Sequence, residues 1–243
     1  MKNNQVDNLI FKALSFVSLE QYHNASDIVE SILNNKSNLD ELNIYHWQCI
    51  GDIYLAMGKF ELARSAYLKA TNTPGVAFTL IITGNIQEAS GMMSSAKDSS
   101  ATFWCNFLID IFSEKKQIRR SPSFLMVRHF LELTVYYLLL AKNSTCIEIL
   151  FKKMNMFSEI NLDAEKLIGY AFLNYGELDQ ALKLLQSAAK RNHLDGEIFF
   201  MLGKLYIMKN MYQEAMSMLQ NAQALLPEHY PTIELIETIK SKV

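Results

Sequence analysis

Apolar residues recur every three or four positions along most of the chain, which is the spacing of one face of an α-helix. No run rich in Val, Ile and Thr alternates apolar and polar residues between turn signals, and only nine Gly and four Pro occur in 243 residues. The pattern therefore predicts an all-α fold. In residues 5–35 it predicts a first helix pair, with apolar positions at Leu9, Ala13, Phe16 and Val17, then Tyr22, Ala25, Val29 and Ile32.

The stretch 162–229 contains the same 34-residue unit twice, and small residues coincide in the two copies. Self-similarity at a fixed period predicts stacked repeats. The same phase extends back to residue 128. Across the last two copies the aligned pairs are Gly169 with Gly203, Phe172 with Tyr206, Ala181 with Ala215, Leu185 with Leu219 and Ala188 with Ala222, and one period earlier the positions hold Val135, Leu138, Ile147, Phe151 and Met154.

Each 34-residue unit is predicted to form two amphipathic helices that pack together. Its small residues allow the two helix backbones to approach, and its aromatic residue fills the space beside them. The pattern resembles the tetratricopeptide repeat, whose signature is a Trp, Leu-Gly and a Tyr, followed by Ala, an apolar residue, Ala and Pro. The copy that matches best carries Trp47, Ile50-Gly51, Tyr54, Ala63, Tyr67, Ala70 and Pro74, and the last copy carries Leu202-Gly203, Tyr206, Ala215, Leu219, Ala222 and Pro227. The resemblance implies a right-handed α-solenoid of helix-turn-helix repeats that holds other proteins.

We expect one solenoid domain over residues 1–243, irregular in the middle and closed by a C-terminal capping helix. The polar residues 34–38 are expected to be a longer connector, and Gly84 follows Gly58 by only 26 residues, which suggests a first helix shortened by about two turns. The expected segments are repeats at about 6–37 and 44–74, a truncated repeat at 76–97, an irregular segment at 98–127, repeats at 128–161, 162–195 and 196–229, and the capping helix at 230–242.

Between the irregular helix and the next repeat lies the basic run 113–123. Three interpretations of this run stay open: a surface for an anionic partner, a phosphorylated Ser-Pro site, and a solvated loop.

Composition and charge argue against nucleic-acid binding, secretion and membrane insertion. A formal net charge of -2 argues against a nucleic-acid surface, since phosphate binding needs clustered Lys and Arg. Three widely spaced cysteines, Cys49, Cys105 and Cys146, suit buried thiols in a reducing compartment. The N-terminus does not resemble a secretion signal, and no apolar run approaches the ~20 residues that span a bilayer. These features predict a cytoplasmic protein without membrane insertion.

No spacing of His and Cys indicates a metal site, and no phosphate loop, nucleophile elbow or paired carboxylates indicate a cofactor or an enzymatic activity. We therefore expect a non-enzymatic protein without cofactors.

The first helices of tandem tetratricopeptide repeats line a concave groove, and helical phase assigns residues to that face. The resemblance places in the groove Tyr45, Gln48, Asp52, Glu132, Tyr136, Lys166, Tyr170, Phe200 and Lys204. Aromatic anchors oriented by two Lys residues predict an apolar or amphipathic protein or peptide segment as the partner. The alternative is that these aromatic residues pack within the chain, for instance beneath the segment 99–127.

The groove lacks the Lys and Asn set with which co-chaperones grip an acidic C-terminus, so we reject that role. Two hypotheses remain: a scaffold or adaptor similar to bacterial secretion or pilus-assembly chaperones, and a regulatory module linked to signalling or transcription and switched by its ligand. The partner, its pathway and the oligomeric state are not predicted by the sequence.

Overall fold

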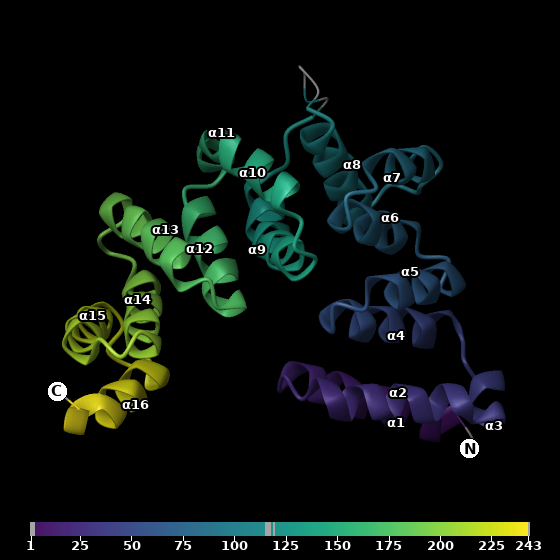
Figure 1. Cartoon of the computed structure of the whole chain (residues 1–243), viewed down its shortest axis with the longest axis horizontal. Helices are drawn as coiled ribbons and strands as arrows, with labels where there is room; N and C mark the ends of the chain where they lie inside the picture. The colour runs from purple at the N-terminus through teal and green to yellow at the C-terminus, as the bar shows by residue number, and fades with distance from the viewer. Residues whose placement is uncertain (1–2, 115–117, 119, 243) are drawn as a thin grey trace. The chain divides into compact units, whose positions relative to one another are not determined.

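The computed structural model describes residues 3–114, 118 and 120–242, and these residues form helices, turns and loops without any strand. The predicted all-α fold is therefore confirmed. The chain divides into two compact units, Met1–Ser121 and Pro122–Val243. Each unit is built mainly of antiparallel helix pairs (Figure 1). That the two units form one continuous solenoid stays a prediction.

Unit 1 contains three helix pairs, α1 with α2, α4 with α5 and α6 with α7, and a single helix α8 that packs on the last pair. Its elements are α1 (Asn3–Ser18), α2 (Tyr22–Asn34), α3 (Lys36–Asp40), α4 (Ile44–Ala56), α5 (Phe60–Lys69), α6 (Thr73–Ile82), α7 (Ile86–Met93) and α8 (Ser100–Phe112).

Unit 2 contains the pairs α9 with α10, α12 with α13 and α14 with α15, and it ends with α16, which packs on α15. Its elements are α9 (Phe124–Leu140), α10 (Ser144–Lys152), α11 (Met154–Ile160), α12 (Ala164–Tyr175), α13 (Leu178–Arg191), α14 (Gly196–Met208), α15 (Tyr212–Leu225), α16 (Tyr230–Ile239) and the 3₁₀ turn Lys240–Lys242.

The turn inside every helix pair has the same backbone form. One residue adopts a positive φ, and the amide of the next residue donates to the carbonyl five residues earlier at 2.8 to 3.0 Å. This is the hydrogen bond of a Schellman motif, in which glycine has no steric cost. The residues with positive φ in the six turns are Glu20, Gly58, Gly84, Lys142, Gly176 and Asn210.

Glycine also permits close helix crossing within the pairs. A Cβ atom on Gly203 would lie 2.6 Å from the Leu219 side chain, and one on Gly51 would lie 2.5 Å from the Tyr67 ring. The aligned Gly169 has the same relation to Leu185, at 2.9 Å. Larger side chains at these positions would force the two helices apart.

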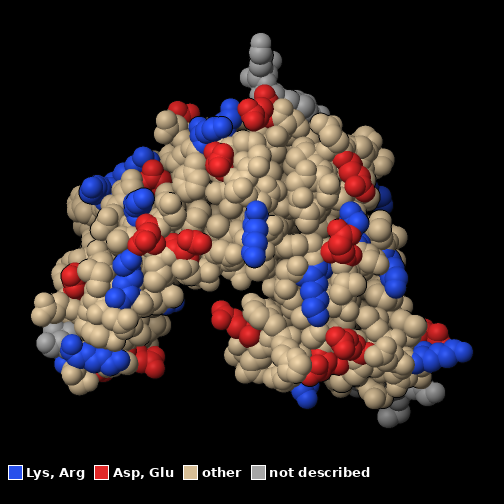
Figure 2. All heavy atoms as spheres, viewed as in Figure 1, with Lys and Arg blue, Asp and Glu red and all other residues tan. Residues whose placement is uncertain are grey.

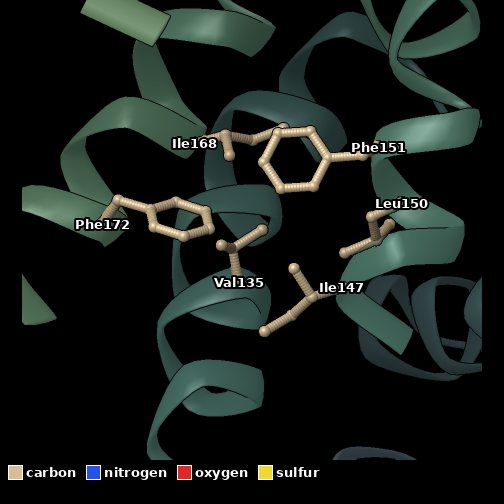
Figure 3. A pocket seen from close by; sticks show the side chains of 6 residues that line it. All are labelled: Val135, Ile147, Leu150, Phe151, Ile168 and Phe172. Atoms are coloured by element: carbon tan, nitrogen blue, oxygen red, sulfur yellow. The ribbon is translucent and has the colours of Figure 1, made fainter. Parts of the chain in front are cut away.

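The α9–α10 pair departs from this arrangement, since it carries Val135 and Ile147 where the other pairs of unit 2 have Gly and Ala. The two helices contact each other along less of their length than α12 with α13. A shallow apolar depression, too small to hold a water molecule, lies between α9, α10 and α12. Figure 3 shows the side chains that converge on it: Val135, Ile147, Leu150, Phe151, Ile168 and Phe172.

The expected connector at residues 34–38 is in fact mostly the short helix α3. Asn35 lies before it, and its side chain accepts hydrogen bonds from the amides of Ser37 and Asn38. Asn and Ser are common in loops, but they are also the preferred residues at a helix N-cap. The polar composition of this segment therefore did not distinguish the two structures.

The sequence predicts that one helix before Gly84 is shorter by about two turns. In the structure the missing residues are instead spread over α5, the connector and α6. Compared with the segment from α13 to α14, α5 is four residues shorter, the connector 70–72 is one residue shorter, and α6 is three residues shorter. The Asn72 side chain accepts a hydrogen bond from the Gly75 amide and Pro74 follows at the helix start, so α6 begins almost directly after α5.

The C-terminal helix α16 caps unit 2 as predicted. Ile236 and Ile239 are buried against Ala215 and Leu219 of α15. Val243, which was expected on the same side, lies outside the described residues. The apolar face of α15 is thereby covered by the chain itself.

Candidate partner-binding face

The residues predicted to line a groove lie in both units, and each unit is described separately. In unit 1 the three predicted residues lie on α4. Tyr45 is 51% exposed, and its hydroxyl pKa is raised by hydrogen bonding with Cys49 and by nearby carboxylates. Gln48 and Asp52 lie one and two turns further along the helix.

Gln48 and Asp52 belong to a continuous polar network that also involves α5 and the start of α6. The Tyr67 hydroxyl donates to Asp52 Oδ1 at 2.7 Å, and Gln48 Nε2 donates to the same oxygen at 3.1 Å. Asn72 Nδ2 donates to Gln48 Oε1 at 2.6 Å, while Asn72 Oδ1 accepts from the Gly75 amide at 3.0 Å. Hydrogen bonds thus hold these side chains in one arrangement, while the Tyr45 side chain of the same helix is exposed.

In unit 2 the predicted residues come from α9, α12 and α14, and the structure brings these three helices together. Lys166 Nζ on α12 donates to Asp195 Oδ2 at 2.7 Å and to Glu197 Oε2 at 3.2 Å, at the start of α14. At the other end of α12, Asn174 Nδ2 donates to Glu132 Oε1 on α9 at 3.5 Å. One face of α12 therefore joins both neighbouring first helices.

Two of the predicted residues are more buried than a groove position implies. Lys166 is 6% exposed and Tyr170 is 9% exposed. Burial alone would lower the pKa of Lys166, but Asp195, Asp163 and Glu197 together raise it above its usual value. Both side chains lie beneath the neighbouring repeats, which helical phase within one helix does not reveal.

The remaining predicted residues are half-buried. Glu132 has a pKa raised by burial, and Tyr136 lies edge-to-face with Tyr137 at 5.6 Å between ring centroids. On α14 the Phe200 ring packs edge-on against His229 at 4.7 Å, and Lys204 Nζ lies 5.9 Å from the Phe200 ring centroid. Phe200 therefore also contributes to the core beneath α16.

The sequence analysis missed the acidic partners of this face, which are Asp163, Asp195 and Glu197. Asp195 caps α14, since its Oδ1 accepts from the amides of Glu197 and Ile198. An Asp before Gly196 and Glu197 is a readable N-cap signal. Its contact with Lys166 could have been inferred only by placing adjacent repeats side by side.

The described residues give little support to a metal site, a reactive cysteine, a surface of one charge or a membrane-spanning helix. In the part of the chain that the structure describes, no group of three His, Cys, Asp or Glu side chains could hold a metal ion. The three cysteines are buried, and burial raises the pKa of the Cys105 thiol to about 12. Figure 2 shows Lys and Arg interspersed with Asp and Glu over the visible face. Among the described helices, none combines the length and apolar character needed to cross a bilayer.

Comparison with known proteins agrees with the repeat pattern. Residues 47–73 match the tetratricopeptide repeat family, and this segment contains the copy of the motif that matched best by inspection. No protein with a curated description matches the chain in sequence.

Solved structures with a similar course of the chain are tetratricopeptide repeat proteins at low sequence identity. One from Parabacteroides merdae is 14% identical, with 96% of this chain and 97% of that chain covered, at a TM-score of 0.42. A thermophilic tetratricopeptide repeat protein from Thermus thermophilus is 15% identical, with 97% of each chain covered, at a TM-score of 0.31. The P58(IPK) TPR domain is 16% identical over 97% of this chain at a TM-score of 0.38, and this chain spans 64% of its length.

The helix pairs of both units share one turn conformation, and Gly residues permit close crossing in each unit. Residues 47–73 therefore form a tetratricopeptide repeat, and the other helix pairs resemble it.

Proposed function

We propose that this protein is a non-enzymatic scaffold or adaptor that binds a segment of a partner protein. The binding surface is the face of unit 2 formed by α9, α12 and α14, which we call the first-helix face. It contains Glu132, Tyr136, Lys166, Tyr170, Phe200 and Lys204. Tyr45, Gln48 and Asp52 of α4 form a second, smaller contact region in unit 1.

This proposal is carried by one observation: in unit 2 the first helix of each of the three helix pairs contacts the first helix of the next pair. The Lys166 contacts with α14 and the Asn174 contact with α9 join the three helices that carry the predicted residues, which supports a shared surface. Tyr136 and Phe200 are half-buried on that surface, so each presents part of an aromatic ring. Aromatic rings of this kind supply much of the free energy of binding at protein interfaces.

The test uses a random peptide library displayed on phage and selected against the immobilised protein. We expect apolar and amphipathic sequences to be enriched, and we expect the variant Tyr136→Ala/Phe200→Ala to lose at least about 2 kcal/mol of their binding free energy. Tyr230→Ala is the matched control, because Tyr230 is an aromatic residue on α16 that is 82% exposed. Unchanged binding by the double variant, with its thermal stability retained, would overturn the assignment.

Two more specific roles stay as hypotheses within this function. A chaperone-type adaptor of bacterial secretion or pilus assembly would hold its partner without changing its own shape. A regulatory module would change the relative arrangement of units 1 and 2 when a ligand binds. Distances between spin labels on the two units, measured with and without a selected peptide, distinguish the roles. We also propose a cytoplasmic location, because three buried free thiols suit a reducing compartment.

A further inference from the structure

The α4–α5 pair differs from α12–α13 and α14–α15 in the residue that lies over the crossing glycine. In those two pairs the residue is a leucine, Leu185 or Leu219, whereas in α4–α5 it is Tyr67. The Tyr67 ring lies against Gly51, and its hydroxyl donates to Oδ1 of the next residue, Asp52, at 2.7 Å. Tyr67 is 2% exposed, so packing fixes the ring that holds this carboxylate. The tyrosine thus adds a polar contact where the other two pairs have only leucine methyl groups.

Two further side chains hold the same carboxylate in place. Gln48 Nε2 donates to Asp52 Oδ1 at 3.1 Å, and Asn72 Nδ2 donates to Gln48 Oε1 at 2.6 Å. Asn72 is fixed in turn, because its Oδ1 accepts from the Gly75 amide at 3.0 Å. The hydroxyl and the amide that donate to Asp52 are both neutral groups. The network therefore orients the carboxylate without neutralising its charge.

The second oxygen of this carboxylate has room for another donor. In the described part of the chain, Asp52 Oδ2 accepts only a long hydrogen bond of 3.4 Å from Gln48, and no Lys or Arg forms an ion pair with Asp52. The Asp52 side chain is exposed, yet enough protein surrounds its carboxyl for desolvation to raise its pKa despite the hydrogen bonds that it accepts. A partly desolvated carboxylate without a counter-ion gains more from a cation than a fully hydrated one does.

We propose that Asp52 binds a Lys or Arg side chain of the partner segment at the contact region of unit 1. The cationic group donates to Asp52 Oδ2 and pairs with the charge of the carboxylate. Tyr45 lies two turns earlier along the same face of α4, and its exposed ring provides an apolar contact for the neighbouring part of the segment. This inference rests on the proposed function, because it assigns the chemistry of the partner at a contact region already named.

Charge complementarity selects this occupant over others. An acidic segment would be repelled by the carboxylate, and a neutral donor would leave its charge without a counter-ion. A metal ion is not favoured, since among the described residues no three His, Cys, Asp or Glu side chains come together as a metal site. An ammonium or guanidinium group supplies the positive charge and the N–H donor together.

The test uses the random peptide library displayed on phage, selected in parallel against wild-type protein and Asp52→Asn. Asparagine keeps an oxygen that can accept from Tyr67 and Gln48, but it removes the charge. We expect peptides selected on the wild type to be enriched in Lys and Arg at one position beside their apolar residues, and we expect Asp52→Asn to lose this enrichment. Asp52→Lys should instead select Asp or Glu at that position, which a merely structural role of Asp52 would not produce.

Affinities of one selected peptide then measure the pair directly. Dissociation constants are determined by fluorescence anisotropy for this peptide and for a version in which Gln replaces its basic residue. The replacement should weaken binding to the wild type about tenfold, the difference between a charge-assisted and a neutral hydrogen bond, and should change binding to Asp52→Asn little. Glu88→Gln is the control and should keep the tenfold difference, because Glu88 is an exposed carboxylate on α7, the second helix of its pair. Thermal unfolding confirms that each variant is folded.

The outcomes separate this inference from the proposed function. Selected peptides that are apolar, lose binding to Tyr136→Ala/Phe200→Ala and show no preference for Lys or Arg would support the first-helix face and overturn the role of Asp52. An enrichment of Lys and Arg that persists on Asp52→Asn would also overturn it. A library that yields no binders to wild-type protein would count against both proposals.

Discussion

Two helix pairs of the same unit, α14–α15 and α9–α10, have the same repeat phase but pack differently. In α14–α15 the crossing residues are Gly203, Ala215 and Leu219, and a Cβ atom added to the glycine would lie 2.6 Å from the leucine. Two periods earlier the equivalent residues are Val135, Ile147 and Phe151. There the crossing is looser, and the Phe151 side chain is 38% exposed beside the apolar depression.

The comparison shows that the repeat period and the packing distance are separate properties. The period is kept by the spacing of apolar positions and by the turn at Lys142 or Asn210, whose backbones are alike. The distance between the helices is set by side-chain volume at the crossing. A repeat can therefore keep its phase and still leave an apolar depression at its surface.

The largest expected effect is the loss of the buried residue at the tight crossing. Leu219 is fully buried, so Leu219→Ala should lower the free energy of unfolding by about 2 to 5 kcal/mol. Phe151→Ala, at the equivalent position of the loose pair, should cost less because its side chain is partly exposed. Urea unfolding followed by circular dichroism measures both. An equal or larger cost for Phe151→Ala would contradict the comparison.

The second-largest effect is expected when the small residue at the crossing of α14 and α15 is replaced by the residue found at the crossing of α9 and α10. Ala215 is fully buried, and Ala215→Ile would introduce the side chain found at Ile147 into the tight crossing. Overpacking should cost about 1 to 3 kcal/mol of unfolding free energy. Ala224→Ile on the exposed side of the same helix is the control and should be close to neutral. A neutral Ala215→Ile would mean that this crossing is not tightly packed.

These crossings were accessible from the sequence, because a period of 34 residues placed Gly203 and Ala215 on facing helices. The short helix α3 was not, since its Asn and Ser residues are equally typical of a loop. The second helix of the α9–α10 repeat also ends early, at Lys152, and only Lys153 separates it from α11. That interruption has no Gly or Pro to mark it.

The sequence predicted only part of the candidate site, and the reason is related. Helical phase gives the direction of a side chain relative to its own helix, and it placed Lys166 and Tyr170 on the face opposite the pair's core. Whether that face is covered depends on α9 and α14, which pack on both sides of α12. Burial of Lys166 and Tyr170 and the acidic groups around them follow from that packing between repeats.

A smaller effect is expected at the turns, where the two pairs have different residues in the same conformation. Lys142 has φ 55° and Asn210 has φ 58°. Lys142→Gly should raise the free energy of unfolding by about 0.5 to 1 kcal/mol, since glycine adopts a positive φ without steric cost. Asn210→Gly should gain less, because Asn tolerates this conformation. Thermal unfolding of both variants tests the order, and a destabilised Lys142→Gly would show that the Lys side chain contributes more than the strain.

The smallest effect concerns the first helices of the two pairs, which carry Glu132 on α9 and Phe200 on α14 at equivalent positions. Burial raises the pKa of Glu132 above its ordinary value of 4.5, so the folded protein holds this proton more tightly than the unfolded chain. The groups of α12 that interact with it are Asn174, whose Nδ2 donates to Glu132 Oε1 at 3.5 Å, and Tyr170, whose hydroxyl pKa the Glu132 charge helps to raise.

The ionised carboxylate therefore destabilises the folded state. This destabilisation is absent below pH 4.5 and is complete above the raised pKa of the folded state. Glu132→Gln should match the wild type in acid and become more stable as the pH rises toward neutrality, by less than about 0.5 kcal/mol. Urea unfolding from about pH 3 to about pH 7 measures the difference. If Glu132→Gln were instead less stable at neutral pH, the hydrogen bond that the carboxylate accepts from Asn174 would stabilise the fold by more than burial of the charge destabilises it.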